Sequence, residues 1–380
     1  MNTDTKIRYR IFISYSHNDE EQVKILSEIL ENNGLCPISD SKLSSGHGFH
    51  DQIKKFIEHA YVFMPIISNS SNEKGWVHEE IGYALAHNIP VLPIVIEEEA
   101  LPKDMIRELQ AIKSIIKAGD KSYLQNEISE LSNKLTWHKI DNLIMASPYE
   151  LARPKYECAY YHIERTMMLV DYAIDIRRLF GEQPKLFRQS GGLSSFHIPN
   201  SSPESEEFKL RYLGSNERVD YLNLWLRGER ILCEEFAREW GFKIIIDLDL
   251  KFEGSGENAL IIRKSRLNTL LKFFKELPQS PEKPGCKFEV IIDENLDKRR
   301  NIIIVGDLFA AEAHAGYLGQ GLRQTMLTRH APTIKNQIEL FDARFEELKN
   351  KQSGDTSVEH AKTEIEKRLK IIEDELNAMK

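Results

Sequence analysis

The sequence predicts an α/β fold, because short apolar runs alternate with amphipathic helical stretches along most of its length. Ile11–Ser14, Tyr61–Ser68 and Ile89–Ile96 are nearly continuous apolar runs, the pattern of strands buried on both faces. The segments between them have apolar residues at helical spacing. Strands and helices alternating in this way are typical of a parallel sheet with helices on both faces.

The first third of the chain carries this pattern most clearly. In chain order we expect a strand at 11–14, a helix capped by Ser16–Asp19 and ended by Gly34, a strand at 35–38, a polar loop at 40–48, a helix around 53–57, a strand at 61–68, a loop at 69–74, a helix at 76–87, and strands at 89–96 and 111–116. In such folds ligands bind beyond the carboxyl ends of the strands, so the loops 14–19, 40–48 and 68–76 are the expected place for chemistry.

The pattern of the sequence beyond the first third predicts a second α/β domain over residues 157–350. Prolines and a loss of periodicity indicate a linker at 138–156. Beyond it we expect helices at 160–179, 219–240, 260–277 and 333–349, strands at 243–248, 288–292 and 302–305, and a polar loop at 189–206.

Residues 356–380 predict a C-terminal amphipathic helix. Thr356 and Glu359 have the spacing of a capping box, and apolar residues follow at steps of three and four. Such a stripe suits either self-association as a short coiled coil or docking on the helix's own domain. The sequence leaves both open.

Composition narrows the class of protein. The 380 residues include 41% hydrophobic and 29% charged residues, which is enough to build globular cores. A formal net charge of −8 argues against a nucleic-acid binder, since phosphate recognition needs a basic surface. The four cysteines have no metal-binding spacing, the N-terminus has no apolar signal segment, and the apolar runs are too short to cross a membrane. We therefore expect a cytoplasmic protein without a metal site.

Four segments together resemble the TIR (Toll/interleukin-1 receptor) domain family, in particular its bacterial NAD-cleaving members. They are Ile11-Phe-Ile-Ser-Tyr-Ser16, the loop from Asp40 to Gly46, Phe63–Ser68, and Trp76-Val-His-Glu-Glu-Ile-Gly-Tyr-Ala84. The resemblance covers residues 7–137 and implies a flavodoxin-like parallel sheet for a first domain at 1–137. The domain at 157–350 resembles no family that we recognise.

The resemblance implies that Glu80 is the catalytic carboxylate, because the family's glutamate follows a tryptophan by four residues and precedes an aliphatic residue. Helix geometry separates Glu80 from Glu79 independently. At about 100° per residue, Glu79 points away from the apolar stripe and Glu80 lies on its flank. The stripe is formed by Val77, Ile81, Ala84 and Leu85. On helix position alone, a solvated surface charge is the simpler interpretation of Glu80.

The implied reaction is cleavage of NAD⁺ into nicotinamide and ADP-ribose, or a cyclic isomer of ADP-ribose. Its transition state resembles the oxocarbenium ion of glycoside hydrolysis, which a carboxylate stabilises. Nicotinamide leaves from a cationic ring and needs no protonation, so no second acid is required. The sequence has no glycine-rich phosphate loop, so NAD⁺ is expected as a substrate and no cofactor is expected.

Other residues of the first domain are candidates for substrate binding. Ser14, Ser16 and His17 follow the first strand, where they line a pocket or serve as caps and turns. Asp40 and Gly46 belong to the loop Asp40–Gly48, which matches the family's mobile loop that packs against a neighbouring subunit and helps close its active site. Two aromatic residues have an open choice between ligand contact and core packing, namely Phe49 and Trp76.

The second domain holds a cluster of polar residues near a predicted strand end. Its members are Asp307, Glu312, Arg323, Gln324, Arg329 and His330. Arginine, threonine and histidine side chains suit a ligand that bears phosphate, so this is a candidate regulatory site. The alternative is helix capping and turn packing around Pro332.

Two functions compete at this point. In the first, the chain is an NAD⁺ glycohydrolase similar to bacterial antiphage effectors, self-associating through its TIR domain and its C-terminal helix in response to an unknown ligand or protein. In the second, the TIR domain is a non-enzymatic adaptor that pairs with other TIR domains. Glu80 favours the first, since an adaptor needs no carboxylate there.

Overall fold

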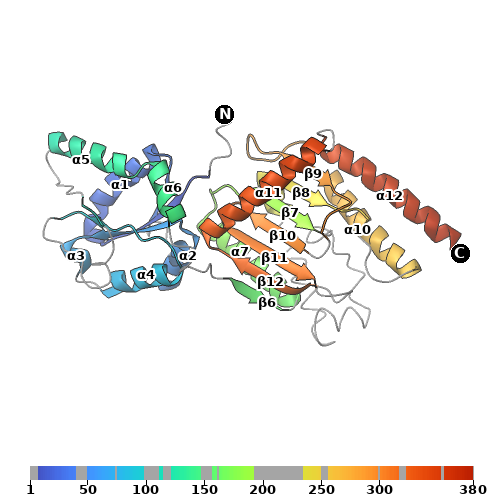
Figure 1. The fold of residues 1–380 in the computed structure, drawn as a ribbon, viewed down its shortest axis with the longest axis horizontal. Helices are drawn as coiled ribbons and strands as arrows, with labels where there is room; N and C mark the ends of the chain where they lie inside the picture. Colours follow the sequence, from blue (N-terminus) through green and yellow to red (C-terminus); the bar gives the residue numbers. More distant parts are fainter. Residues whose placement is uncertain are drawn as a thin grey trace. The chain divides into compact units, whose positions relative to one another are not determined.

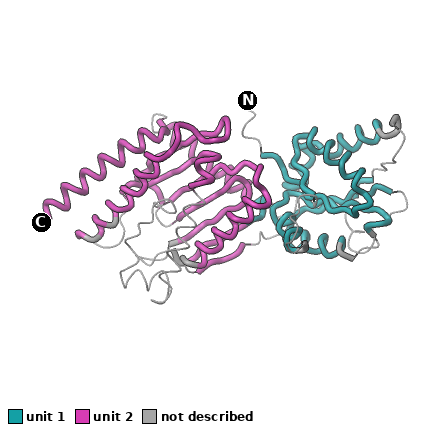
Figure 2. Tube along the Cα trace, turned by 180° about the vertical axis from the view of Figure 1, so that it is seen from behind, with its two compact units in different colours: residues 1–155, 329–333 teal, residues 156–328, 334–380 magenta. Residues whose placement is uncertain are grey.

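The computed structural model describes residues 7–39, 49–72, 75–97, 111–113, 121–146, 156–160, 162–191, 234–249, 256–297, 300–315, 322–351 and 355–379. The chain divides into two compact units, one of residues 1–155 with 329–333 and the other of residues 156–328 with 334–380 (Figure 2). Each unit has its own sheet. Within the described residues, no helix has the length and apolar character needed to cross a membrane.

The sheet of the first unit is parallel throughout, as the sequence predicts. Its strands lie in the order β2-β1-β3-β4-β5. They are β1 (Arg10–Ser14), β2 (Cys36–Ser39), β3 (Val62–Ile67), β4 (Ile94–Val95) and β5 (Ile112–Lys113). Every residue of β1 and β3 is buried, which explains their unbroken apolar sequences.

Helices cover this sheet on both faces (Figure 1). They are α1 (Glu20–Asn32), α2 (Phe49–His59), α3 (Asn69–Asn72), α4 (Gly75–Ala86), α5 (Lys121–Lys134) and α6 (Trp137–Ala146), with a short 3-10 turn, η2 (His17–Asp19), before α1. The alternation of strands and helices confirms the predicted α/β class of this unit.

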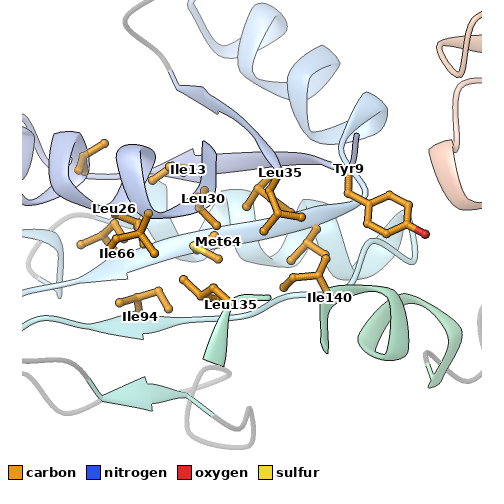
Figure 3. Close-up of a cluster of buried hydrophobic side chains, with 14 of the residues drawn as sticks. Tyr9, Ile13, Leu26, Leu30, Leu35, Met64, Ile66, Ile94, Leu135 and Ile140 are labelled. Carbon is orange, nitrogen blue, oxygen red and sulfur yellow. The ribbon is translucent and has the colours of Figure 1, made fainter. Parts of the chain in front are cut away.

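Two layers of apolar side chains fill the first unit. On one face, alternate residues of β1 and β3, such as Ile13 and Met64, pack with Leu30 of α1 and with Leu135 (Figure 3). On the other face, the ring of Phe12 stacks on those of Phe56 in α2 and Phe63 in β3, with centroids 5.7 and 5.9 Å apart. The period of two along each strand separates these layers.

The predicted linker at 138–156 is wrong in its first part. Residues 137–146 form α6, and Ile140 and Ile144 are buried in the core of the first unit. Trp137 stacks on Tyr9 and donates a hydrogen bond from its indole nitrogen to the Ile7 carbonyl at 3.2 Å. The prolines that suggested a linker lie after this helix, and residues 147–155 fall outside the described residues.

The second unit is built on a mixed sheet with the strand order β6-β12-β11-β10-β7-β8-β9. The strands are β6 (Glu157–Ala159), β7 (Phe187–Gly191), β8 (Phe242–Ile246), β9 (Phe288–Ile292), β10 (Arg300–Val305), β11 (Phe309–Ala315) and β12 (Leu322–Thr328). β7, β8 and β9 run parallel, and the other neighbours are antiparallel. The α/β class predicted for this part is correct.

Several strands of this sheet escape the sequence analysis. β7 occupies Phe187–Gly191, so the loop predicted from residue 189 is wrong at its start. β11 has the sequence Phe-Ala-Ala-Glu-Ala-His-Ala, and alanine has little preference for strands. Hydrogen bonding to β10 and β12 on either side fixes it as a strand despite its sequence.

The helices described for the second unit are α7 (His162–Leu179), α10 (Glu257–Lys275), α11 (Ala331–Lys351) and α12 (Val358–Ala378), together with residues 234–240. α11 crosses one face of the sheet (Figure 1), where Asp342 binds Arg188 of β7. α7 and α10 cover the other face. There Tyr172 contacts Phe309, and Phe274 stacks on Phe242.

The C-terminal helix docks on its own unit. α12 buries Ala361, Ile365, Leu369 and Ile372, and ion pairs such as Lys264–Glu373 link it to α10. Its N-cap is Ser357, whose hydroxyl accepts from the His360 amide at 3.1 Å. The capping box predicted for Thr356 and Glu359 is therefore wrong, because the N-cap is one residue later and the third residue of the helix is His360. The Thr356 carbonyl instead accepts a hydrogen bond from the Val290 amide. Of the two roles considered for the apolar stripe, the structure shows docking.

Candidate functional site

Glu80 lies on the partly shielded flank of α4, as the helix geometry predicts. Only 7% of its surface is exposed, whereas the neighbouring Glu79 is exposed to solvent. Val77, Ile81 and Ala84 are buried next to the sheet. The structure thus separates the two adjacent glutamates by their environment.

Leu85 is the one member of the predicted stripe that does not join the core. Its side chain is 40% exposed. At about 100° per residue, the buried sector of α4 extends from Glu80 through Val77 to Ile81, and Leu85 lies beyond its far edge. The helix is therefore rotated toward Glu80 relative to our expectation, which places the carboxylate deeper than the apolar pattern alone indicates.

A serine at the end of the first strand holds Glu80. Ser14 is the last residue of β1 and is 4% exposed. Its hydroxyl donates a hydrogen bond to Oε2 of Glu80 at 2.5 Å. Because Ser14 lies at the carboxyl end of a parallel strand, this bond places Glu80 at the edge of the sheet where ligands bind in such folds. A carboxylate with a short charge-assisted hydrogen bond is fixed in orientation.

A second group of buried polar residues lies at the ends of β1 and β3, and the sequence analysis missed it. Asp19 is 4% exposed, and Ser68 and Ser71 are fully buried. The Ser68 hydroxyl donates to Asp19 Oδ2 at 2.7 Å, and the Ser68 amide donates to the Ser71 hydroxyl at 2.8 Å. These bonds tie the segment after β1 to the segment after β3.

The signal for this network was present but was interpreted as helix capping. Ser16–Asp19 has the composition of an N-cap, yet neither Ser16 nor Asp19 makes a side-chain capping bond. The Asp19 carboxylate faces Ser68, which comes from a strand about fifty residues later in the chain. Composition near a helix start cannot distinguish a local cap from a long-range partner.

The remaining candidates of this loop differ in exposure. Ser16 is 1% exposed, and its carbonyl accepts from the Asp19 amide at 2.7 Å, which is turn chemistry. His17 is exposed, and its ring makes an edge contact with Tyr15. Of the three loop candidates, the structure places Ser14 against Glu80.

Four further predicted site residues are described in part or lie outside the described residues. Asp40 and Gly46 lie outside them. Phe49 is the first residue of α2 and Trp76 the second residue of α4, and their side chains lie outside the described set. Their proposed contacts with substrate stay predictions.

The structure does not bring the polar residues predicted for the second domain into one site. Asp307 lies in the turn between β10 and β11, whereas Glu312 and Gln324 lie toward the other end of β11 and β12. Gly306 has a φ of +52°, and an added Cβ would meet the Pro184 carbonyl at 2.2 Å. The turn therefore requires a glycine at this position. The Arg323 side chain lies outside the described residues.

Arg329 and His330 belong to the first unit. Arg329 Nη1 lies 3.1 Å from Glu58 Oε2, and His330 Nε2 lies 3.3 Å from the Asn88 carbonyl. Burial lowers the pKa of His330, which favours its neutral form. These contacts correct the expectation that both residues join Glu312 and Gln324 around one ligand. Across the described residues, no group of three or more histidine, cysteine, aspartate or glutamate side chains is arranged to hold a metal ion.

Comparisons with known proteins assign the first part of the chain to one family. A family model described as TIR domain matches residues 11–125, which include both Ser14 and Glu80. Among solved structures, the chain is similar to the TIR domain of the Toll-related receptor TRR-2 from Hydra magnipapillata. The identity is 18% and the TM-score 0.28, over 33% of this chain and 98% of that chain. A comparison with curated proteins finds no match. Residues 11–125 of the chain belong to the TIR domain family.

Proposed function

We propose that the TIR domain cleaves NAD⁺ at the bond between nicotinamide and ribose, with Glu80 as the catalytic carboxylate. The observation that carries the proposal is the buried Glu80 side chain, held by Ser14 at the carboxyl edge of the parallel sheet. Surface glutamates of a helix are usually solvated, as Glu79 is. A carboxylate shielded from water interacts more strongly with a positive charge that develops beside it.

The reaction needs one such group. As the C1′–N bond breaks, its electron pair leaves with the nicotinamide nitrogen, which becomes neutral, and the ribose acquires oxocarbenium character. A carboxylate near the ribose stabilises this charge and orients the sugar through its hydroxyls. Water then attacks C1′ and loses a proton to solvent, which gives ADP-ribose. Attack by the adenine of the same molecule gives a cyclic isomer instead.

Ser14 is a positioning residue in this scheme. Its hydroxyl donates to Oε2 of Glu80 and so fixes the orientation of the carboxylate, which is proposed to contact a ribose hydroxyl of the substrate. Ser16, His17, Asp40, Gly46, Phe49 and Trp76 are proposed to surround the substrate, on the resemblance described above. NAD⁺ is the substrate, and the proposal requires no cofactor and no metal.

The test compares two adjacent glutamates. The purified full chain is incubated with NAD⁺, and nicotinamide and its co-products are separated by chromatography. Glu80→Gln keeps the shape of the side chain and removes its charge, so we expect nicotinamide release to fall by about 10³-fold. Glu79→Gln removes an exposed charge one residue away, so its activity should stay within about twofold of the unaltered chain.

Two outcomes contradict the proposal. One is nicotinamide release that falls equally in both variants, which would show that the difference in burial has no catalytic meaning. The other is absence of turnover in the unaltered chain at any protein concentration, while it still pairs with itself. That second result would instead support an adaptor that acts by TIR–TIR pairing.

We further propose that the chain is a cytoplasmic antiphage effector that becomes active on self-association. An unrestrained enzyme of this kind would consume its own cell's NAD⁺, so the second unit is proposed to restrain it until a ligand or partner protein binds. Such a ligand must bind the active state more tightly than the inactive one. Specific activity that stays constant from nanomolar to high micromolar protein, with only monomer on sizing, would contradict activation by assembly.

A further inference from the structure

The second unit contains a pocket of about 450 Å³ between the face of the sheet and α11. Its floor includes Ile245 of β8 and Ile302 of β10, and Phe341 of α11 forms a wall. All of these belong to one unit, and Glu312 is the one residue it shares with the regulatory cluster predicted from sequence. The volume is within the range of pockets that enclose small organic ligands.

Strand register explains why these side chains meet. Ile245 pairs with Ser190, Ser190 with Ile302, and Ile302 with Glu312. Residues in one such row across a sheet point to the same face, here the face that α11 covers. Across the pocket the row contains two isoleucines separated by a serine and then a glutamate, so a mostly apolar floor meets a carboxylate on one side.

The charges of the rim favour a cation over an anion. The described lining includes three carboxylates (Asp293, Asp297 and Glu312) and two guanidinium groups (Arg300 and Arg344). Arg344 lies 3.2 Å from Asp293, and Arg300 binds Glu312. An anionic ligand would have to compete with these carboxylates for the arginines. An ammonium group can add to a carboxylate that already binds an arginine, because each carboxylate accepts several hydrogen bonds.

Three further basic side chains lie on this face of the sheet, outside the described lining. His314 lies 3.2 Å from Glu312, and the other two are matched by carboxylates of α11. Lys243 lies 3.2 Å from Asp342 and 3.8 Å from Glu346, and Arg188 binds Asp342. Two carboxylates therefore match two cations beneath α11. The acidic excess of the described pocket lining remains.

The pocket contains one buried hydrogen-bond acceptor that a ligand could satisfy. Gln337 of α11 lines the pocket, and its Oε1 is buried with no hydrogen-bond partner among the residues that the structure describes. Leaving such an acceptor unsatisfied costs about 1–3 kcal/mol, so a ligand that donates there gains affinity. An N–H group of a ligand supplies this donor.

We propose that this pocket binds a small organic cation with an aromatic body, of the class of arylalkyl amines. The aromatic body packs on Ile245, Ile302 and Phe341, and the ammonium group binds at the acidic rim. A nitrogen of the ligand donates to Gln337. The proposal concerns binding to the second unit and does not depend on NAD⁺ cleavage by the first.

Three probes that share an indole ring test the charge requirement. Tryptamine is a cation, tryptophan a zwitterion and indole-3-propionate an anion. Calorimetry on the full chain should give a Kd for tryptamine below about 1 mM, and binding of indole-3-propionate weaker by about tenfold or more. Tryptophan adds a carboxylate to the same ammonium, so it should bind more weakly than tryptamine, and tighter binding of tryptophan would overturn the proposed preference for a cation. Absence of tryptamine binding at 1 mM, or equal binding of the anion, overturns the proposal.

A matched pair of variants on α11 tests the position. Gln337→Leu removes the unsatisfied acceptor, so tryptamine affinity should fall by about tenfold while the melting temperature does not decrease. Glu339→Gln changes an exposed residue of the same helix, outside the described lining, and should bind tryptamine as the unaltered chain does. Tryptamine binding that is unchanged by Gln337→Leu would place the ligand elsewhere and overturn the assignment.

Discussion

Each unit of this chain holds a carboxylate against its sheet, Glu80 buried and Asp342 31% exposed, and the partners described for the two differ. In the TIR domain, Glu80 accepts a hydrogen bond from the neutral hydroxyl of Ser14. In the second unit, Asp342 binds two cations, with Arg188 as a bidentate partner at 2.8 and 3.0 Å and Lys243 at 3.2 Å. A carboxylate matched by two cations contributes to folding, whereas Glu80, oriented by a hydroxyl at a sheet edge, is the carboxylate that we propose acts on a ligand.

The pKa of Asp342 reflects this difference. Burial opposes its ionisation, but hydrogen bonds and charges from Arg188, and then Lys243, lower the pKa below its usual value. A carboxylate with a lowered pKa in the folded state contributes stability above its unfolded pKa and loses it as the pH falls through the folded value. Asp342 is thus tied to the stability of the second unit at neutral pH.

The largest expected effect concerns the face of α4 that carries Glu80. Ile81→Ala should lower the free energy of unfolding of the TIR domain by about 2–5 kcal/mol, because it leaves a cavity beside the sheet. Leu85→Ala should cost less than about 1 kcal/mol, because Leu85 is 40% exposed. Urea denaturation measures both. Equal losses would show that α4 does not present Glu80 on the buried flank.

The comparison of the two carboxylates is tested next by Asp342→Asn. This substitution leaves Arg188 and Lys243 without the anion that they share. The second unit should therefore lose about 2–3 kcal/mol of its free energy of unfolding at neutral pH. The loss is smaller than for a fully buried ion pair because Asp342 is 31% exposed. Glu346→Gln is the control, since Glu346 is more exposed and lies 3.8 Å from Lys243. The difference between Asp342→Asn and the unaltered chain should shrink as the pH falls below about 4, and a constant difference would contradict the ion-pair account.

A smaller effect is expected in the polar network behind Glu80. Ser68→Ala removes a donor from the buried Asp19 carboxylate and should destabilise the TIR domain by about 1–2 kcal/mol. Ser70→Ala, on the exposed side of the same segment, should be nearly silent, because Ser70 accepts a bond from Asn18 in solvent. Thermal unfolding followed by circular dichroism distinguishes them, and similar melting temperatures for the two variants would contradict a buried role for Ser68.

The smallest expected effect is the change of unfolding free energy with pH that is caused by Lys185 of the second unit. Burial lowers its pKa to about 8, with Lys283 and Arg177 adding to the shift and Glu239 opposing it. The folded state therefore releases this proton before the unfolded state does. Relative to Lys185→Met, the unaltered chain should gain stability as the pH rises from about 8 to 10.5, by no more than about 1.4 kcal/mol per pH unit.

Urea denaturation of the unaltered chain and Lys185→Met across this range measures that slope. A stability difference independent of pH would mean that Lys185 has an ordinary pKa. The Lys185 ammonium donates to the Gly181 and Gln183 carbonyls and lies 5.2 Å from the centre of the Trp240 ring. Because Lys185→Met also removes these contacts, the slope is the informative quantity and the absolute difference is not.

The TIR domain was predictable because its strands are buried on both faces. Ile11–Ser14 and Tyr61–Ser68 are apolar without interruption, and their ends are marked by capping and turn residues. The different environments of Glu79 and Glu80 on α4 were also predictable from sequence, since the two side chains differ by about 100° in direction. The rotation that buries Glu80 and exposes Leu85 depends on how the helix packs, which no local pattern encodes.

The second unit was harder to predict because long-range pairing fixes several of its strands. β11 is rich in alanine, and β12 carries arginine, glutamine and threonine, which we interpreted as a ligand site. The pocket went unrecognised for the same reason. Ile245, Ile302 and Phe341 become neighbours only through sheet register and the crossing of α11. Only Glu312 was singled out from sequence, for a site that the structure does not assemble.

The strand order of the two sheets has a consequence for protein synthesis. The first sheet is complete once β5, at Ile112–Lys113, has been made. In the second sheet, β6 (Glu157–Ala159) pairs with β12 (Leu322–Thr328). Its first strand therefore cannot pair until its last strand in chain order has been synthesised. Domains fold as units while the chain emerges from the ribosome. Each nascent chain therefore passes through an interval in which the TIR sheet is formed and the second sheet is still open, and during translation any restraint by the second unit comes late.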